Sequence, residues 1–366
     1  MNQHKKIIFI HLLNDYSGSP KVLSQVINTF KKNNFDIELY TGKGGDGFLS
    51  HFADDEHYHY PYKRFNNRLL TLLSFMLSQL SLFFKLLKYR DKDVIIYVNT
   101  LLPFGAALAG KLMKKPVYYH IHETSITPLI FKNFLRTIAQ FTAIKIIFVS
   151  KAVKKLEPFL DIPQEVIYNT LSDNFVKVAA QNKYSFLYNK TFNILMICSL
   201  KTYKGIHEYV KISALCEQNT HIKFTLILNA EESEIDLFFK EISIPSNLSL
   251  LPKQKNLVPF YSKTSLLLNL SRIDEWIETF GLTIIEGMAF GIPSIVPPIG
   301  GPAEIVSHEK EGYLISSYKT DVIAKKIQAL SVDEKQCQLM SKASKEKIKH
   351  FNEQAFEEKI LEVLSR

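Results

Sequence analysis

The chain has 366 residues, of which 46% are hydrophobic and 22% are charged. This length exceeds what one compact core accommodates and suits two domains, and the two fractions exclude a mainly disordered chain. The 45 Lys+Arg and 36 Asp+Glu residues give a net charge of +9. Three cysteines are too few for a disulfide framework, so a reducing compartment is expected.

The excess charge belongs to one half of the chain. Residues 1–190 contain 25 Lys+Arg and 14 Asp+Glu, a net charge of +11, whereas residues 191–366 contain 20 and 22, a net charge of −2. A basic half favours nucleic acid, anionic lipid headgroups or phosphorylated substrates as partners. A merely solvated basic surface is the alternative.

Short β-branched runs alternate with helical segments along the first half, which is typical of a parallel sheet with helices on both faces. We expect strands at residues 7–12, 36–41, 94–99, 117–122, 145–150 and 166–168. We expect helices at residues 20–32, 69–89, 103–115, 129–142 and 151–160.

The helix expected from residue 69 has an uncharged run, 69–84, of sixteen residues, which is short of the ~20 needed to span a bilayer. An apolar body with basic flanks is typical of a helix in a bilayer interface, and packing on the first sheet is an alternative compatible with it. The basic flanks are Lys63, Arg64, Arg68, Lys85, Lys88 and Arg90. Nucleic-acid binding fits poorly, because no recognised module is present.

A polar stretch at residues 178–190 interrupts the alternation. Further strands are expected at residues 192–197, 223–228, 248–250, 265–270 and 294–296. The sequence therefore predicts an α/β fold of two tandem Rossmann-like, doubly wound domains that face a central cleft. The predicted domains are residues 1–177 and 192–349, with a final helix of about residues 350–366 that has the option of packing back on the first domain.

Three local patterns carry little weight. A Gly-x-Gly-x-x-Gly at residues 42–47 follows the second strand instead of the first, and we interpret it as a flexible glycine-rich loop. Asp91-Lys-Asp93 precedes a strand, so we interpret it as the end of a helix. His57 and His59 lie on an apparent loop and are expected at the surface. No metal site is expected.

The segment at residues 271–306 carries the most information. A helix is predicted to begin near Phe280 or Gly281, with Glu278 just before it and Glu286 about two turns inside it. The free amides at the start of a buried helix form an anion site, here at Phe280, Gly281, Leu282 and Thr283. Two carboxylates beside such a site can accept hydrogen bonds from vicinal hydroxyls. The pattern indicates a nucleotide-sugar site.

On these residues the chain resembles the retaining glycosyltransferases of family 4, which have the GT-B fold. The match consists of two glutamates separated by seven residues, Glu278 and Glu286, followed by a Gly-Gly-x-x-Glu-Ile-Val turn at residues 300–306. The motifs at residues 149–152, 167–169 and 204–205 occur in the same order in the family.

The resemblance assigns roles to individual residues. It implies that Glu278 contacts the donor sugar, Glu286 the ribose, and Lys204 the diphosphate. The family has an arginine where this chain has Ser199, and Lys201 is a candidate replacement for its charge. The turn after the first strand matches with Gly18 as its one remaining glycine.

In the first domain, the resemblance implies that His122 touches the donor sugar near the reacting carbon, with Glu123 a candidate for acceptor binding. A structural role for His122 within the sheet edge is the alternative. His120 alternates to the same face of the strand as His122, so only the motif distinguishes them.

The resemblance further implies retention of configuration without a metal or other cofactor. We expect a cytoplasmic enzyme that uses a nucleotide-sugar donor and a glycan or lipid-linked acceptor, with contact to the inner face of the cell membrane through the basic half. Nucleic acid is not expected as a partner. A nucleotide-sugar-binding scaffold protein without turnover is the alternative, motivated by Ser199 and the single Gly18. A sugar epimerase of related fold would need further residues that the sequence does not identify.

Overall fold

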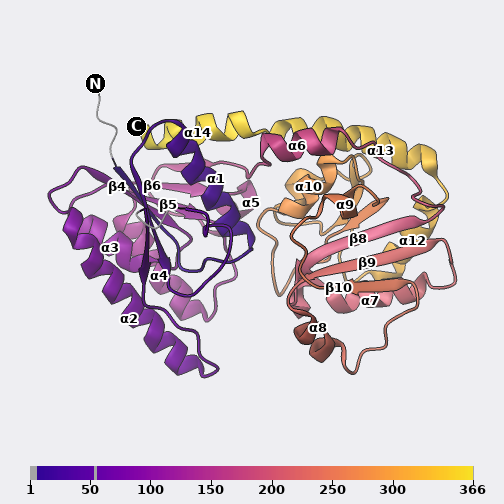
Figure 1. The fold of residues 1–366 in the computed structure, drawn as a ribbon, viewed down its shortest axis with the longest axis horizontal. Helices are drawn as coiled ribbons and strands as arrows, with labels where there is room; N and C mark the ends of the chain where they lie inside the picture. The colour runs from indigo at the N-terminus through magenta and orange to yellow at the C-terminus, as the bar shows by residue number, and fades with distance from the viewer. Residues whose placement is uncertain (1–5, 53–55, 366) are drawn as a thin grey trace. The chain divides into compact units, whose positions relative to one another are not determined.

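The computed structural model describes residues 6–52 and 56–365. The chain forms two compact units (Figure 1). The first consists of Met1–Asn169 together with Gln354–Arg366, and the second of Thr170–Glu353. This division falls before the polar stretch at residues 178–190 and assigns the last helix to the first unit.

The first unit contains one parallel sheet in the order β3-β2-β1-β4-β5-β6-β7. Its strands are β1 (Lys6–Ile10), β2 (Ile37–Gly42), β3 (His57–Tyr60), β4 (Val94–Asn99), β5 (Val117–Ile121), β6 (Lys145–Phe148) and β7 (Gln164–Val166). The central strands β1, β4 and β5 are buried along almost their whole length because helices cover both of their faces.

The helices of this unit follow from right-handed crossovers between parallel strands, which place α1 on one face of the sheet and α2, α3 and α4 on the other (Figure 1). They are α1 (Gly18–Lys32), α2 (Arg68–Leu86) with η1 (Leu87–Tyr89), α3 (Phe104–Leu112), α4 (Leu129–Thr142), α5 (Lys151–Leu156) and α14 (Glu353–Ser365). The last helix buries Phe356 and Ile360, and its Glu357 accepts a hydrogen bond from Lys32.

One expectation for this unit was wrong in part: His57 and His59 do not lie on a loop and His57 is buried, whereas His59 is exposed as expected. His57 and His59 lie on strand β3, and the hydroxyl of Thr41 contacts both rings, at 2.8 and 3.1 Å. A four-residue strand without aliphatic residues gives no β signal in the sequence. The helix from Arg68 to Tyr89 has 22 residues, so it is long and apolar enough to cross a membrane by length and composition. Core helices of soluble proteins can have the same length and apolar composition.

The second unit contains a parallel sheet in the order β10-β9-β8-β11-β12-β13. Its strands are β8 (Phe192–Ser199), β9 (Ile222–Asn229), β10 (Leu248–Leu251), β11 (Leu266–Leu268), β12 (Ser294–Val296) and β13 (Gly312–Leu314), the last of which the sequence did not predict. Its helices are α6 (Asp173–Ala180), η2 (Thr202–Lys204), α7 (Ile206–Leu215), α8 (Glu232–Phe239), α9 (Val258–Tyr261), α10 (Leu282–Ala289), α11 (Pro302–Ile305), α12 (Thr320–Leu330), α13 (Glu334–Lys347) and η3 (Ile348–Phe351).

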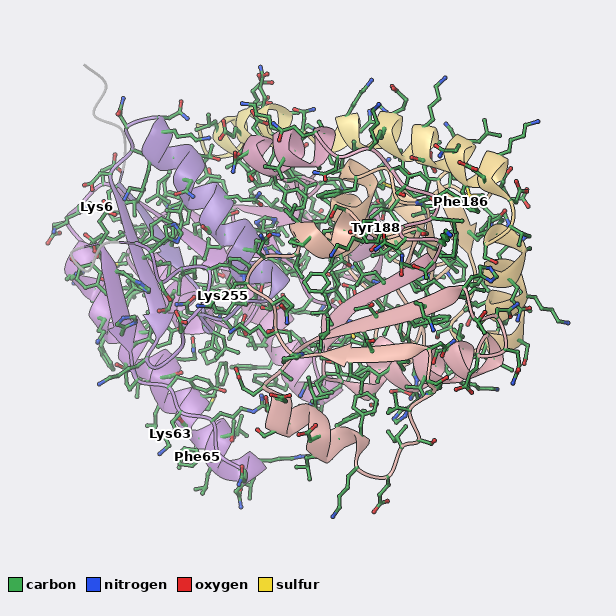
Figure 2. All side chains as sticks on the ribbon, turned by 45° about the vertical axis from the view of Figure 1, so that its right-hand side comes forward. Lys6, Lys63, Phe65, Phe186, Tyr188 and Lys255 are labelled. Atoms are coloured by element: carbon green, nitrogen blue, oxygen red, sulfur yellow. The ribbon has the colours of Figure 1, made fainter. Side chains whose placement is uncertain are left out.

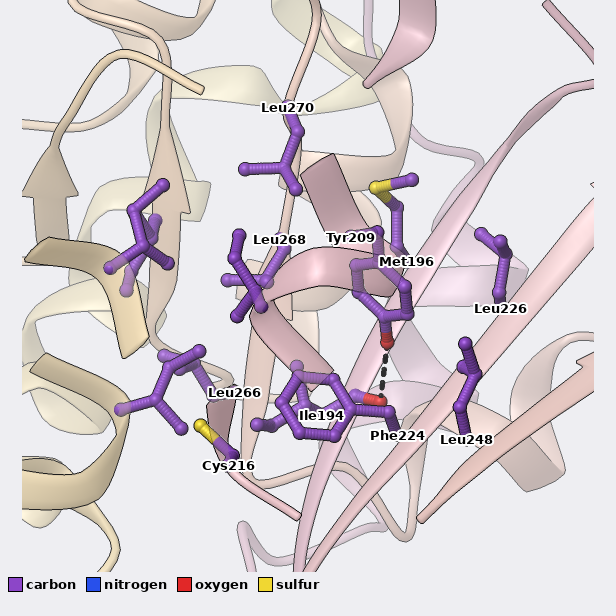
Figure 3. Packing of buried hydrophobic residues seen from close by; sticks show 14 of the residues in the cluster. Ile194, Met196, Tyr209, Cys216, Phe224, Leu226, Leu248, Leu266, Leu268 and Leu270 are labelled. Carbon is purple, nitrogen blue, oxygen red and sulfur yellow. Dashed lines mark hydrogen bonds between the residues drawn. The ribbon is translucent and has the colours of Figure 1, made fainter. Parts of the chain in front are cut away.

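The core of the second unit packs α7 against the sheet (Figure 3). Tyr209 lies at its centre, edge-on to Phe224 with ring centroids 5.5 Å apart, and its hydroxyl donates to the carbonyl of Ile194 at 3.0 Å. This core fixes α7 against strands β8 and β9.

Both sheets reverse their strand order at one point, between β1 and β4 in the first unit and between β8 and β11 in the second. At such a point the loops that follow the two strands diverge to opposite faces and leave a crevice, where open α/β sheets bind ligands. Each unit therefore has a defined place for a site.

Candidate active site

Lys204 and Glu278 meet at the reversal point of the second sheet. Lys204 follows β8 in the turn η2, and Glu278 lies in the loop between β11 and α10. The ammonium of Lys204 donates to Glu278 Oε2 at 2.6 Å, and both side chains are mostly buried, with 16% and 18% exposed. The structure thus brings together two residues that lie 74 positions apart and that the sequence proposed for one site.

Glycine at position 205 makes this approach feasible. Gly205 has φ +80°, and a Cβ on it would lie 2.1 Å from the carbonyl oxygen of Leu270 at the end of β11. The backbone N–H of Arg272 also donates to the carbonyl of Tyr203 at 2.8 Å. The turn after β8 and the loop after β11 therefore pack backbone to backbone.

The carboxylate of Glu278 is held in its charged form. Burial alone would raise the pKa of Glu278, but the charge of Lys204 and hydrogen bonds from Lys204, Ser271 and Asn269 outweigh burial and lower it below the ordinary value. The Ser271 hydroxyl donates to Oε2 at 3.2 Å. In the free protein, Glu278 therefore accepts hydrogen bonds from other side chains of the same unit.

An aromatic pair borders Lys204. Tyr203 and Trp276 stack with centroids 4.9 Å apart, and the Lys204 ammonium lies 5.4 Å from the Trp276 ring centroid. Sequence reasoning missed Trp276, Ser271 and Asn269. The signal available for the last two was their position directly after a buried strand.

The double glycine at residues 300–301 packs against the backbone of the loop that carries Glu278. The N–H of Gly301 donates to the carbonyl of Glu278 at 2.9 Å. A Cβ on Gly300 would lie 2.4 Å from that carbonyl oxygen, and one on Gly301 would lie 2.3 Å from the Cα of Phe280. This turn therefore positions the loop that carries Glu278.

Helix α10 begins at Leu282 after Gly281, whose φ of +108° turns the chain into the helix. Phe280, just before it, is buried, while Leu282 is partly exposed. Glu286 lies inside the helix and is 4% exposed. The Tyr261 hydroxyl donates to Glu286 Oε2 at 2.6 Å, and the Tyr261 ring stacks on Phe290. Tyr261 was not among the predicted site residues.

Lys201 is exposed at the start of η2 and Ser199 is the last residue of β8. Their backbones are linked, since the N–H of Lys201 donates to the carbonyl of Ser199 at 2.8 Å. Lys201 thus leaves the same strand end as Lys204. A hollow of about 340 Å³ elsewhere in this unit, between α7 and residues 242–245, contains none of the predicted site residues.

In the first unit, three polar residues follow the central strands. His11 follows β1, Asn99 ends β4, and His122 follows β5. Nε2 of His122 lies 2.9 Å from Oδ1 of Asn99, and Nδ2 of Asn99 lies 3.2 Å from Nδ1 of His11 and donates to the carbonyl of Ser19. Because the amide oxygen only accepts, Nε2 of His122 carries the proton. Sequence reasoning missed His11 and Asn99.

These histidines are neutral. Burial lowers the pKa of His11 to about 4 and that of His120 to about 3. The pKa of His122 is also well below its ordinary value, through burial first and then through His120 and His11. His120 binds the Tyr97 hydroxyl through Nδ1 at 2.8 Å, and its ring lies 4.3 Å from that of His122.

Glu123 faces the backbone. Its Oε1 accepts from the N–H of Leu101 at 2.8 Å and its Oε2 from that of His122 at 3.2 Å. Burial raises its pKa to about 7, although these two hydrogen bonds act in the opposite direction. In the free protein Glu123 thus links the loops after β4 and β5.

Gly18 is the exposed first residue of α1. The glycine-rich loop at residues 42–47 packs closely against the segment after β1. A Cβ on Gly45 would lie 2.2 Å from the carbonyl oxygen of Asn14, and one on Gly47 would lie 2.3 Å from that of Asp15. The expectation of a loosely held loop is therefore wrong, and these glycines permit close backbone packing.

Within residues 6–52 and 56–365, no group of three or more His, Cys, Asp or Glu side chains is placed to hold a metal ion. The charged groups at the second reversal point include Lys204 and Glu278. An ammonium, a carboxylate and a helix start at one strand edge can bind an anion and a neighbouring polyol together.

The chain is similar in sequence to known glycosyltransferases. Residues 179–347 match the family model described as "Glycosyl transferases group 1". The N-acetyl-alpha-D-glucosaminyl L-malate synthase of Bacillus anthracis is 26% identical over 275 residues, which cover 71% of each chain. Sucrose synthase 2 of Zea mays is 46% identical over 56 residues, which are 15% of this chain and 6% of that protein.

Solved structures match the whole chain. A crystal structure of Anabaena Alr3699/HepE in complex with UDP and glucose has a TM-score of 0.82 at 18% identity, covering 99% of this chain and 100% of that one. Sucrose-phosphate synthase from Thermosynechococcus elongatus has a TM-score of 0.76 at 15% identity, covering 99% and 98%. The predicted fold of two doubly wound domains is confirmed. The chain has the GT-B fold, and its residues 179–347 are similar to the group 1 glycosyl transferases.

Proposed function

We propose that this protein transfers a sugar from a nucleotide-diphosphate sugar to a glycan or lipid-linked acceptor. The observation that carries the proposal is the Lys204–Glu278 pair at the reversal point of the second sheet, 2.6 Å apart and mostly buried. The Lys204 ammonium can bind the diphosphate of such a donor, and the adjacent Glu278 carboxylate can accept hydrogen bonds from its sugar hydroxyls. The neighbouring solved structure with UDP and glucose supports the same donor class.

In the proposed reaction, Lys204 and the first amides of α10 stabilise the negative charge that develops on the departing diphosphate. Lys201 adds charge from the same strand end. Glu278 accepts hydrogen bonds from the donor sugar, and Glu286, oriented by Tyr261, accepts them from the ribose. His122 touches the sugar near the reacting carbon. Gly18 allows close approach of backbone amides, and Glu123 contributes to acceptor binding.

The proposed transfer retains the configuration of the reacting carbon. The bond from that carbon to the diphosphate oxygen breaks, the acceptor oxygen forms the new bond on the same face, and the departing phosphate oxygen takes the acceptor proton. The positive groups named above supply the charge that a divalent ion would otherwise supply. Undiminished transfer in the presence of a chelator is therefore expected.

The proposed location is the cytoplasmic face of the cell membrane. The support is the charge of the first unit, which contains 24 Lys+Arg and 16 Asp+Glu, against 21 and 20 in the second. A lipid-phosphate acceptor at an anionic membrane is complementary to this unit.

A donor screen tests the proposal. Binding of a panel of nucleotide-diphosphate sugars is measured by calorimetry, followed by transfer assays with lipid-linked acceptors. Lys204→Met keeps the length of the side chain but removes its charge, and a loss of transfer of about a hundredfold or more is expected, as for other preorganised electrostatic groups. Lys349→Met, which breaks an exposed pair with Glu346, is the matched control and should transfer normally.

The proposal fails if no nucleotide-diphosphate sugar binds, or if Lys204→Met transfers as well as the control. Saturable donor binding without hydrolysis or transfer with any acceptor would instead identify a scaffold protein.

A further inference from the structure

Helix α2 exposes much more apolar surface than an ordinary surface helix, although it also buries Phe75, Leu82 and Leu86. Its buried positions include the polar residues Ser78 and Gln79, whereas most of its leucines are exposed. A helix on the surface of a water-soluble unit usually places its apolar residues inward and its polar residues outward. The exposed leucines therefore need a partner other than water.

Specific contacts fix this rotation of α2. Oε1 of Gln79 on α2 accepts from the N–H of Gly105 on α3 at 3.1 Å, while the buried Ser78 hydroxyl is satisfied within α2 by the carbonyl of Phe75 at 2.6 Å. A Cβ on Gly105 would lie 2.2 Å from the carbonyl oxygen of Gln79, so α2 and α3 are in close backbone contact. Turning the leucines inward would break the hydrogen bond between Gln79 and Gly105 together with this backbone contact.

The exposed side chains form one continuous stripe, which we name the leucine face and define as Leu69, Leu73, Leu77, Leu80 and Phe84. Their spacing of four, four, three and four residues places them on one side of a helix. Leu69 is 76% exposed and Phe84 60%.

The start of α4 extends this surface. Phe131 of α4 contacts Phe75 of α2 with ring centroids 5.5 Å apart. Ile130, next to it in the chain, is 84% exposed, and Leu129 is 67% exposed. The apolar surface is therefore shared by two helices on the same side of the sheet.

The surrounding charge is strongly positive. Residues 57–156, which contain α2, α3 and α4, hold 16 Lys+Arg and only 3 Asp+Glu, a net charge of +13. Lys63, Arg64 and Arg68 are exposed at the start of α2. Figure 2 shows Lys63 beside Phe65 at this end of the molecule, and the Lys63 ammonium lies 5.4 Å from the Phe65 ring centroid.

We propose that the leucine face and the basic cluster of Lys63, Arg64 and Arg68 bind the surface of an anionic phospholipid bilayer, with α2 lying in the plane of the interface. Leucine and phenylalanine enter the acyl boundary while the basic side chains contact headgroup phosphates. A spanning orientation conflicts with the opposite side of α2, which is packed on its own unit. A second copy of this chain would bring two surfaces of like charge together.

This inference goes beyond the transfer reaction and does not rest on it, so the test uses the full protein without a donor. Sedimentation measures binding to vesicles of phosphatidylcholine alone and of phosphatidylcholine mixed with phosphatidylglycerol. At least tenfold stronger binding to the mixed vesicles is expected, and it should weaken as salt is added. Sedimentation equilibrium without vesicles gives the oligomeric state.

Two sets of substitutions with matched controls locate the surface. Lys63→Gln/Arg64→Gln/Arg68→Gln should weaken binding about a hundredfold, because each basic residue near anionic lipid contributes about fivefold. Its control, Lys325→Gln/Lys335→Gln/Lys342→Gln, removes the same charge from exposed positions of the second unit. Leu73→Gln/Leu77→Gln/Leu80→Gln should weaken binding at least tenfold, whereas Leu237→Gln/Val332→Gln/Leu339→Gln, at exposed apolar positions elsewhere, should not.

All nine positions named on the two test surfaces and in the apolar control are exposed, and thermal melting checks that each variant folds like the wild type. Equal binding to neutral and anionic vesicles, absence of binding, or equal effects of test and control variants would overturn the proposal. It would also be overturned if the Leu→Gln variant dissociated a stable dimer, which would identify a second copy as the occupant.

Discussion

In the free protein, Lys204 and Glu278 satisfy each other, and under the proposed function a donor has to replace both partners at once. Its diphosphate becomes the counter-ion of Lys204, and its sugar hydroxyls become donors to Glu278. A nucleoside diphosphate without a sugar replaces only one partner and leaves Glu278 as a competing anion beside Lys204. The ion pair therefore favours the complete donor over the product left after transfer.

This exchange predicts opposite effects for one substitution. In Glu278→Gln the negative charge is gone, so a nucleoside diphosphate should bind about fivefold more tightly, as for loss of a partly exposed ion pair of about 1 kcal/mol. The nucleotide sugar should bind at least tenfold more weakly, because charge-assisted hydrogen bonds are lost. Calorimetry with both ligands measures the two changes. Changes in the same direction would show that Glu278 does not discriminate between them.

A second test removes the one hydroxyl group by which Tyr261 orients Glu286. Tyr261→Phe removes the hydroxyl that holds Glu286 and leaves a buried carboxylate oxygen without this donor. We expect a loss of about 1–3 kcal/mol in the free energy of unfolding and weaker donor binding. Urea unfolding and calorimetry measure the two quantities.

Tyr209→Phe is the matched control for this change, since its buried hydroxyl donates to backbone carbonyls of the same unit, away from Glu286. It should lose a comparable amount of stability and keep donor affinity. If both variants bind the donor equally well, Tyr261 has no role in orienting Glu286.

The site residues that sequence could reach are those with a pattern of their own. Glu278 and Glu286 stand out through their spacing and the glycines that follow. Glu278 and Lys204 were expected in one site, and they are in contact in the structure. Other site residues are recognised only by contacts between distant segments, as for Asn99, His11 and Tyr261. His11 and Asn99, for example, are in contact although 88 positions separate them. Single-sequence patterns do not record such contacts.

At the scale of elements, the turn after β8 depends on glycine for two separate reasons, its positive φ and the lack of space for a Cβ. Gly205→Ala should therefore cost more than the ~1–2 kcal/mol of a left-handed alanine, because Leu270 must also move. The shift carries Lys204 with it, so donor affinity should fall. Fluorescence of Trp276, the only tryptophan, reports unfolding and ligand binding in this unit.

Gly44→Ala provides the comparison for this element, because Gly44 also has a positive φ, +96°, but nothing lies within 4 Å of its Cβ position. It should lose only the backbone contribution and bind the donor normally. Equal losses in the two variants would show that the packing against Leu270 relaxes freely.

Strands with apolar runs were predictable, whereas the two short edge strands β3 and β13 were not. The buried central strands β1, β4 and β8 consist of apolar runs, whereas β3 reads His-Tyr-His-Tyr and β13 has three residues. Pairing along a neighbouring strand defines these two edge strands, and pairing is a tertiary property. The exposure of the leucines of α2 was equally beyond a periodicity argument, because composition does not say which side of an apolar helix is covered.

For the whole molecule, pH should act mainly on the first unit. His11 and His120 have depressed pKa values in the folded state, about 4 and about 3, so the stability they contribute is present above pH ~6.5 and is lost as the pH falls. By pH ~5 each should have lost about 2 kcal/mol. The pKa of Glu123 is raised to about 7, so its contribution grows as the pH falls and offsets part of this loss.

We therefore expect the melting temperature to fall between pH ~7 and ~5. A single substitution should make this fall smaller. His120→Asn retains a polar atom for the Tyr97 hydroxyl but takes up no proton, so its melting temperature should depend less on pH than that of the wild type. His350→Asn, at an exposed position, is the control and should keep the full dependence. Scanning calorimetry across this range measures all three proteins. If His120→Asn and the wild type lose stability in parallel, acid unfolding starts outside the buried histidines, and the excess positive charge of the first unit becomes its cause.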